Sequence, residues 1–172
     1  MIVWLNGTFG AGKTTTAALL KDALPARVFD AEHVGYLLRG IIGDLPHTDF
    51  KEWAPWRTLT VATAKEVLDL AGGTLVIPQS VLQRPHWTEL MDGFAAHDIP
   101  VRAYTLHADR DTFTTRVRAD TVETGALEWR LDHRDAYESA LDAWMSDQTT
   151  VIDTTHRTPA DVCAQITAAT NA

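Results

Sequence analysis

The feature that most constrains the fold stands at the start of the chain, where an apolar run leads directly into a glycine-rich segment. Residues 2–6 are apolar at nearly every position, which is typical of a central parallel strand buried on both faces. The next segment, Gly7-Thr8-Phe9-Gly10-Ala11-Gly12-Lys13-Thr14, matches the pattern G-x-x-x-x-G-K-[ST], and a helix is expected to begin near Lys13. A strand, a tight loop and a helix in this order predict an α/β domain.

The residue types in this segment are those of a loop that binds a polyphosphate. Its three glycines let the backbone curl so that successive N–H groups point inward, and the following helix adds about half a positive charge at its start. Lys13 can reach the β- and γ-phosphates, and the hydroxyl of Thr14 can ligate a Mg²⁺ ion that bridges them. The predicted binding residues are Gly7, Thr8, Phe9, Gly10, Ala11, Gly12, Lys13, Thr14 and Thr15.

Strand-length apolar runs alternate with helical stretches along the rest of the chain, which favours a doubly wound parallel sheet in a single domain of residues 1–172. The later strands are predicted at 27–30, 74–78, 101–107 and 149–153. Helices are expected over 31–42, 50–71 and 109–144, the last broken near Gly125. In the second helix one arc holds the predicted core-facing stripe of Leu59, Ala62, Val67 and Leu70.

Charge and cysteine content narrow the classes of partner. Lys and Arg number 15 against 23 Asp and Glu, and the formal net charge of −8 disfavours general binding to nucleic acid or to an anionic membrane. Cys163 is the only cysteine, which excludes an intramolecular disulfide and favours a reducing cytoplasm. The start of the chain has no basic segment, and its apolar run is too short for a signal peptide or a membrane span.

Polar residues at the strand ends are candidates for the rest of the site. An Asp normally ends the third strand and completes the metal site, but Gln79 stands there. Asp30, after the second strand, is the better candidate acid, because such sheets bind ligands beyond the carboxyl ends of their strands. Its alternative role is the N-cap of the next helix, which is compatible with catalysis. Glu32 and His33 are expected to be solvated.

Arginines and aromatic residues supply further candidates, each with a structural alternative. The stretch after the fourth strand contains Arg110, Arg116, Arg118, Arg130 and Arg134. The guanidinium fork suits phosphate oxygens, so the group favours anion binding although each arginine alone could be a surface residue. Trp53 and Trp56, with Phe50 and Arg57, form an aromatic cluster that is either core or a platform for a ligand.

Several segments resemble the tunicamycin-resistance ATP-binding proteins, a P-loop group related to small-molecule and nucleoside monophosphate kinases. They are MIVWLNGTFGAGKTTTA, FDAEHVGYLLRG, DFKEWAPWR, LVIPQSVLQRP and TRVRAD, and the similarity covers most of the chain. The resemblance implies a P-loop NTPase three-layer sandwich with five parallel strands in the order 2-3-1-4-5, a small helical lid, and ATP with Mg²⁺ as cofactors.

The resemblance also implies roles for particular residues. An acceptor region at about residues 31–71 would hold the substrate, and a lid at about 116–145 would carry Arg116, Arg118 and Arg130 beside the phosphates. The adenine would lie near Asp153, Thr154 and Thr155. The expected substrate-site residues are Asp30, Arg39, Trp53, Trp56, Arg57 and Gln79. The expected catalytic residues are Lys13, Asp30, Arg116 and Arg130.

Two functions of different classes fit this pattern. In the first, the protein transfers a phosphoryl group from ATP to a hydroxyl of a small molecule. In the second, ATP occupancy gates the sequestration of a nucleoside antibiotic such as tunicamycin, without chemistry. Both make the partner a small molecule, tunicamycin or another nucleoside.

Replacing Lys13 tests the binding loop directly. Lys13→Ala removes a charge-assisted contact of about 1.5–3 kcal/mol, so we expect ATP affinity to fall roughly 10- to 150-fold in calorimetric titration. The fold should survive, because this side chain is expected to face the ligand. Equal ATP affinity in the variant would show that the loop does not bind the phosphates.

Overall fold

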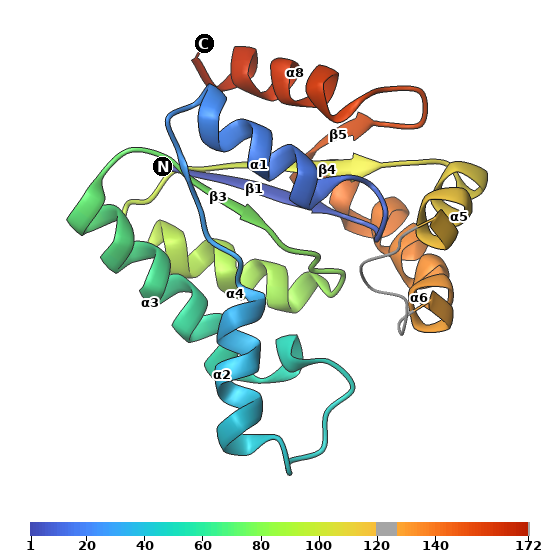
Figure 1. Cartoon of the computed structure of the whole chain (residues 1–172). Helices are drawn as coiled ribbons and strands as arrows, with labels where there is room; N and C mark the ends of the chain where they lie inside the picture. Colours follow the sequence, from blue (N-terminus) through green and yellow to red (C-terminus); the bar gives the residue numbers. More distant parts are fainter. Residues whose placement is uncertain (120–126, 172) are drawn as a thin grey trace.

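The computed structural model describes residues 1–119 and 127–171, without the side chains of residues 127–130. At its centre lies one parallel sheet of five strands in the order β2-β3-β1-β4-β5 (Figure 1). The strands are β1 (Ile2–Gly7), β2 (Arg27–Val28), β3 (Leu75–Pro78), β4 (Val101–His107) and β5 (Thr150–Asp153). Because β1 is central and buried along its whole length, the predicted fold class and strand order are confirmed.

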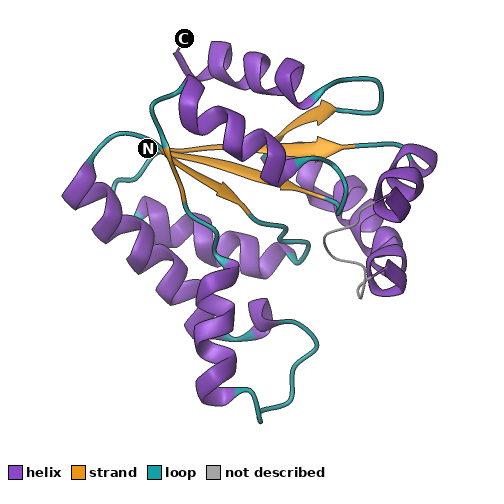
Figure 2. Ribbon diagram, viewed as in Figure 1, coloured by secondary structure: helices purple, strands orange, loops and turns teal. Residues whose placement is uncertain are grey.

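Helices cover both faces of the sheet and make three layers (Figure 2). One face carries α1 (Lys13–Ala23) and α8 (Pro159–Asn171), and the other carries α3 (Ala54–Ala71) and α4 (Arg84–Ala95). Helix α2 (Glu32–Ile42) and the short 3₁₀ helix η1 (Phe50–Glu52) project beyond the second layer. Past the strand ends stand α5 (Arg110–Ala119) and α6 (Leu127–Ala140), and α6 continues into the π-helix η3 (Leu141–Met145) and α7 (Ser146–Gln148).

The central strand β1 contributes to two separate cores, because successive side chains of a strand point to opposite faces. Trp4 belongs to the core under α3 and α4, where its ring meets Trp87 edge-on with the ring centroids 5.7 Å apart. Val3 and Leu5 belong to the core under α1 and α8. Packing on both faces fixes β1, and it therefore also fixes the loop that follows its last residue.

Helix α3 buries a different face from the predicted one. Leu70 is 91% exposed, Leu59 is 37% exposed and Ala62 is also exposed, so the predicted stripe was wrong at these three positions. Only Val67 of the predicted stripe packs against the core. The buried residues of α3 are Trp56, Arg57, Thr60, Val61 and Ala64. Because this face contains an arginine and a threonine, apolar periodicity could not identify it.

Some element boundaries also differ from the sequence expectation. The helix predicted over 50–71 is divided into η1 and α3, because Trp53 between them has an extended backbone with ψ 118°. The second strand is shorter than expected and ends at Val28. The predicted break near Gly125 falls in residues 120–126, which lie outside the described residues.

Helix α2 meets η1 through a glycine. A Cβ atom on Gly35 would lie 2.6–2.8 Å from atoms of the Phe50 ring, so a larger residue there would force the two elements apart. On the same helix, Gly40 has no atom within 4 Å of the equivalent position. These two glycines therefore offer a matched test of the packing between α2 and η1.

We expect alanine at these two positions to change stability in opposite directions. Gly35→Ala overpacks the contact with Phe50 and should lower the free energy of unfolding by about 1–3 kcal/mol. Gly40→Ala should raise it by up to about 1 kcal/mol, because alanine is the better helix former. Urea denaturation measures both changes. A rise in stability for Gly35→Ala would contradict the close approach of η1 to α2.

Candidate functional site

The phosphate-binding loop (residues 7–14) connects β1 to α1, and its glycines have backbone conformations that other residues rarely adopt. Gly10 has φ 68° and Gly12 has φ 90°. Gly7 has φ 128°, and a Cβ atom there would overlap the carbonyl oxygen of Leu106 on the adjacent strand β4. A Cβ on Gly10 would lie 3.1 Å from the Val117 side chain, so α5 packs closely against the loop.

Lys13 spans the mouth of this loop. Its Nζ donates hydrogen bonds to the carbonyl oxygens of Thr8 at 2.7 Å and Gly7 at 3.2 Å. Thr14 and Thr15 follow at the start of α1, where both are exposed and line the cavity beside the loop. A polyphosphate in this cavity would therefore meet a lysine, hydroxyl groups and the helix N-terminus together.

A buried asparagine anchors the start of the loop. The Asn6 Oδ1 accepts hydrogen bonds from the N–H of Gly7 at 2.8 Å and of Val81 at 3.0 Å, and its Nδ2 donates to the Val81 carbonyl at 3.0 Å. The Ser80 hydroxyl donates to the Gly7 carbonyl at 2.7 Å. These bonds join the loop to the segment after β3. Neither Asn6 nor Ser80 can be identified from the sequence, because an isolated polar residue beside the motif gives no signal.

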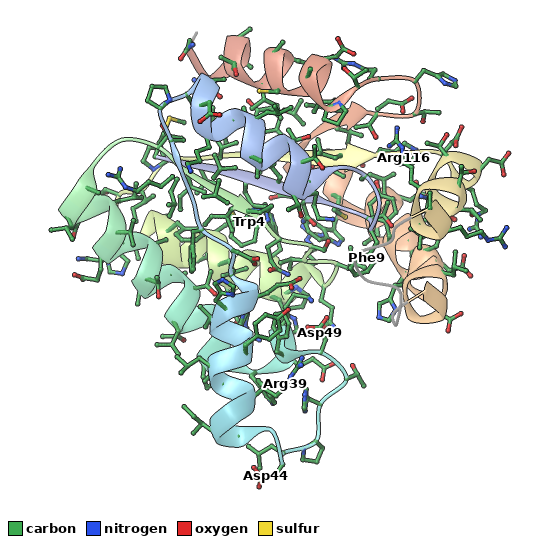
Figure 3. The ribbon with its side chains drawn as sticks, viewed as in Figure 1. Trp4, Phe9, Arg39, Asp44, Asp49 and Arg116 are labelled. Carbon is green, nitrogen blue, oxygen red and sulfur yellow. The ribbon has the colours of Figure 1, made fainter. Side chains whose placement is uncertain are left out.

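One cavity of about 1040 Å³ extends from this loop to α2 and the segment of residues 47–51. The loop side comprises residues 9–16, and the opposite side, which we call the acceptor wall, comprises Glu32, Tyr36, Arg39 and residues 47–51. In Figure 3, Phe9 and Arg116 lie on one side of this region, and Arg39 and Asp49 lie on the other. Arg39 and Gln79, both predicted to be substrate residues, line this cavity.

The acceptor wall is polar and charged. The Tyr36 hydroxyl donates to Glu32 Oε2 at 2.8 Å, and the Arg39 guanidinium lies 5.6 Å from the centre of the Tyr36 ring. Asp49 forms an ion pair with Lys51, so the two opposite charges offset each other. Of these residues, sequence reasoning found only Arg39. Glu32 was expected to be solvated, yet it lines the cavity.

Arg116 closes a third side of the cavity. Its guanidinium donates to the hydroxyl of Thr154 at 3.1 Å and to the Thr154 carbonyl at 2.8 Å. Arg157, which sequence reasoning missed, lines the same side. Asp153 and Thr155, which flank Thr154 in the chain and were also expected near the adenine, do not line the cavity. Hydrogen bonds from Thr155 hold the pKa of the Asp153 carboxyl below its usual value.

The other arginines after β4 do not act as a group. Arg118 is exposed and does not line the cavity. Because Arg116 and Arg118 are two residues apart on one helix, their side chains point in different directions. Arg110 and Arg134 both form ion pairs with Glu138. The side chain of Arg130 lies outside the described residues.

Four predicted substrate residues support the acceptor wall from behind instead of lining the cavity. Trp56 is fully buried and donates from Nε1 to the Ala31 carbonyl at 2.9 Å, and Trp53 is also buried. Arg57 is 8% exposed, pairs with Glu89, and donates to the carbonyls of Lys51 at 2.7 Å and Glu52 at 3.2 Å. Asp30 is exposed, and its Oδ1 accepts from the N–H of Glu32 at 2.9 Å.

Gln79 lies where the third strand meets the phosphate-binding loop. It is 3% exposed and lines the cavity, and among the described residues nothing forms a hydrogen bond with its Oε1. Leaving such a group unpaired costs about 1–3 kcal/mol. A buried acceptor at this place fits a ligand that brings its own donor.

The residues at the loop fit a Mg²⁺ ion that arrives with a nucleotide. Thr14 offers a hydroxyl and Gln79 an unpaired amide oxygen, and both line the cavity. Across the described part of the chain, no group of three His, Cys, Asp or Glu residues could hold a metal by itself. Phosphate oxygens and water molecules would therefore supply most of the ligands, as Mg²⁺ commonly requires.

Comparison with known proteins gives one family match and many structural matches. The family described as "AAA domain" matches residues 2–147. No curated protein matches the sequence.

Within residues 1–119 and 127–171, no helix is both long enough and apolar enough to cross a bilayer.

Solved structures of similar fold include a tunicamycin resistance protein and two kinases. The tunicamycin resistance protein of Deinococcus radiodurans is 31% identical, with a TM-score of 0.76, and the alignment covers 98% of this chain and 94% of that one. A sugar kinase from Janibacter sp. HTCC2649 is 19% identical, with a TM-score of 0.67 over 96% and 91% of the two chains. A gluconokinase from Sinorhizobium meliloti 1021 is 18% identical, with a TM-score of 0.61 over 96% and 89%. The two kinases show that the fold is shared.

The support that Arg57 gives to the acceptor wall can be measured. Arg57→Met leaves the carbonyls of Lys51 and Glu52 without their donor, so we expect the free energy of unfolding to fall by about 1–3 kcal/mol. Lys65→Met is the matched control on α3, because Lys65 pairs with Asp69 at the surface and should contribute at most about 0.5 kcal/mol. Equal losses for the two variants in chemical denaturation would contradict a supporting role for Arg57.

Proposed function

The chain belongs to the AAA-domain family and is a relative of a tunicamycin resistance protein, and from this premise we propose that it is an ATP-dependent phosphotransferase. It would transfer the γ-phosphoryl group of ATP to a hydroxyl of a small molecule. The observation that carries this proposal is a single cavity bounded by a phosphate-binding loop on one side and a polar acceptor wall on the other. The cavity volume of about 1040 Å³ lies at the upper end of the range found for pockets that bind one drug-sized ligand. A cavity of this volume gives room for a nucleotide and a small acceptor together.

The loop would hold the nucleotide and neutralise charge during transfer. Its backbone N–H groups and Lys13 bind the β- and γ-phosphates, and Arg116 supplies a further positive charge from α5. Thr14 would help to hold a Mg²⁺ ion, which would offset the negative charge that develops on the phosphates. The adenine would lie toward Thr154 and Arg157, which line the cavity beside Arg116.

The acceptor wall would position the attacking hydroxyl. Its oxygen forms a bond to the γ-phosphorus while the bond from that phosphorus to the β–γ bridging oxygen breaks, so ADP leaves and the hydroxyl proton passes to a carboxylate. In the hypothesis drawn from the sequence, Asp30 is the catalytic acid and would accept or orient this proton. In the structure two carboxylates line the cavity, Glu32 and Asp49, and Asp49 is paired with Lys51. Asp30 does not line it, and one of its oxygens accepts a hydrogen bond from the Glu32 N–H at the start of α2.

The proposed acceptor is tunicamycin or another nucleoside antibiotic, and its phosphorylation would confer resistance. The D. radiodurans relative is named for resistance to tunicamycin. Such ligands join a uracil nucleoside and amino sugars to a fatty chain. Polar groups of the acceptor wall suit the sugars. Leu37, Ile41 and Leu45 are exposed apolar residues of α2 and the segment after it, and they would contact the fatty chain. The buried, free Cys163 supports a reducing location such as the cytoplasm.

One observation favours a second function, ATP-gated sequestration of the antibiotic without chemistry. The third strand is followed by Gln79, an uncharged residue, where a phosphotransferase of this fold is expected to have an acid. The two functions share the nucleotide site and differ in whether a phosphorylated product forms.

Mass spectrometry of tunicamycin after incubation with protein and Mg·ATP separates the two functions. We expect the antibiotic to gain one phosphoryl group with the native protein and none with Lys13→Ala. Glu32→Gln should lower turnover by about 100-fold or more if its carboxylate takes the proton, whereas Asp30→Asn keeps the helix cap and should lower it little. The reverse ranking would assign the proton to Asp30. Tight binding of tunicamycin without any mass gain would instead support sequestration.

A further inference from the structure

Gln79 has a fixed backbone and an unsatisfied side chain. Its N–H donates to the Leu5 carbonyl at 3.1 Å, and its carbonyl accepts from Trp4 Nε1 at 2.9 Å. The backbone therefore cannot move away from β1, the strand that leads into the phosphate-binding loop. The side chain is buried and lines the cavity, yet among the described residues its Oε1 has no hydrogen-bond partner.

The chemistry of an amide oxygen restricts what it can bind. Oε1 only accepts hydrogen bonds, and phosphate oxygens also accept, so this atom cannot bind a phosphate directly. It needs a donor that arrives with the ligand. Since Mg²⁺ keeps several of its water molecules when it binds a nucleotide, a metal-bound water beside Thr14 is such a donor.

We propose that Gln79 binds the metal-bound nucleotide through a water molecule on the metal, at the place where an acid would otherwise complete the site. The proposal rests on the proposed function only in requiring that Mg·ATP binds the loop. Because Gln79 carries no charge, it contributes to metal binding only when the nucleotide is present, and the protein alone should not retain Mg²⁺. The amide thus acts on the complex of metal and nucleotide.

Calorimetric titration of ATP, with Mg²⁺ and with EDTA, tests this role without relying on turnover. Gln79→Met keeps the length of the side chain but removes the acceptor, so we expect affinity in Mg²⁺ to fall about 3- to 10-fold and affinity in EDTA to stay unchanged. Gln79→Glu should bind metal-bound water more strongly, lower the Mg²⁺ concentration needed for half-maximal binding, and weaken binding in EDTA through repulsion of the phosphates.

Gln83 offers a matched control. It is an exposed glutamine four residues further on, outside the cavity lining. Gln83→Met and Gln83→Glu make the same chemical changes and should leave ATP affinity unaltered in both conditions.

Thermal unfolding supplies a second readout that a merely structural role would not give. Without ligand, Gln79→Met removes an unpaired buried group, so the Tm should stay the same or rise. With Mg·ATP the increase in Tm should be smaller than in the native protein. A lower Tm without ligand would overturn the proposal and make Gln79 a structural residue.

Other outcomes also overturn the proposal. Equal loss of affinity in Mg²⁺ and EDTA would show that Gln79 acts on the nucleotide itself, and a change only in the affinity for tunicamycin would make it an acceptor residue. If neither Gln79 variant alters Mg·ATP binding while Lys13→Ala abolishes it, this inference fails and the nucleotide site stands. If the native protein does not bind Mg·ATP, the proposed function fails together with it.

Discussion

The hydrogen bonds of Asn6 hold the phosphate end of the cavity together. Asn6 is the last residue before the loop, and its amide joins the Gly7 N–H to both backbone groups of Val81. Because this amide is fully buried, water cannot compete for the three bonds. The loop and the segment carrying Gln79 and Ser80 therefore keep one relative position, and the cavity between them is formed without a ligand.

The acceptor wall is held by different means. Its segment of residues 47–51 has no sheet to support it, and it depends on Phe50 packing against Gly35 and on the two carbonyls bound by Arg57. Both contacts connect it to helices outside the central sheet. A change in the wall can therefore occur without a change in the loop.

Local sequence patterns predicted the parts that depend on local interactions. The apolar strand, the glycines and the lysine of the loop imply their own geometry, and five apolar runs gave the class and number of the strands. Apart from Arg39, the polar residues of the acceptor wall could not be found this way, because the packing of α2 on η1 places Glu32 and Asp49 at the same cavity. Arg57 illustrates the same limit: a sequence pattern cannot show that Glu89, 32 positions away, makes the burial of a cation tolerable.

The bonds that Lys13 makes to the carbonyls of its own loop have a consequence for selectivity. An incoming ligand competes on this ammonium group with carbonyl oxygens that already accept hydrogen bonds at 2.7 and 3.2 Å. A neutral ligand offers acceptors no better than those carbonyls, so the exchange gives it no net advantage. An anionic phosphate forms stronger, charge-assisted bonds and can displace them. The loop thereby discriminates by charge, and an uncharged nucleoside in the same cavity would have little tendency to compete for the position of the triphosphate.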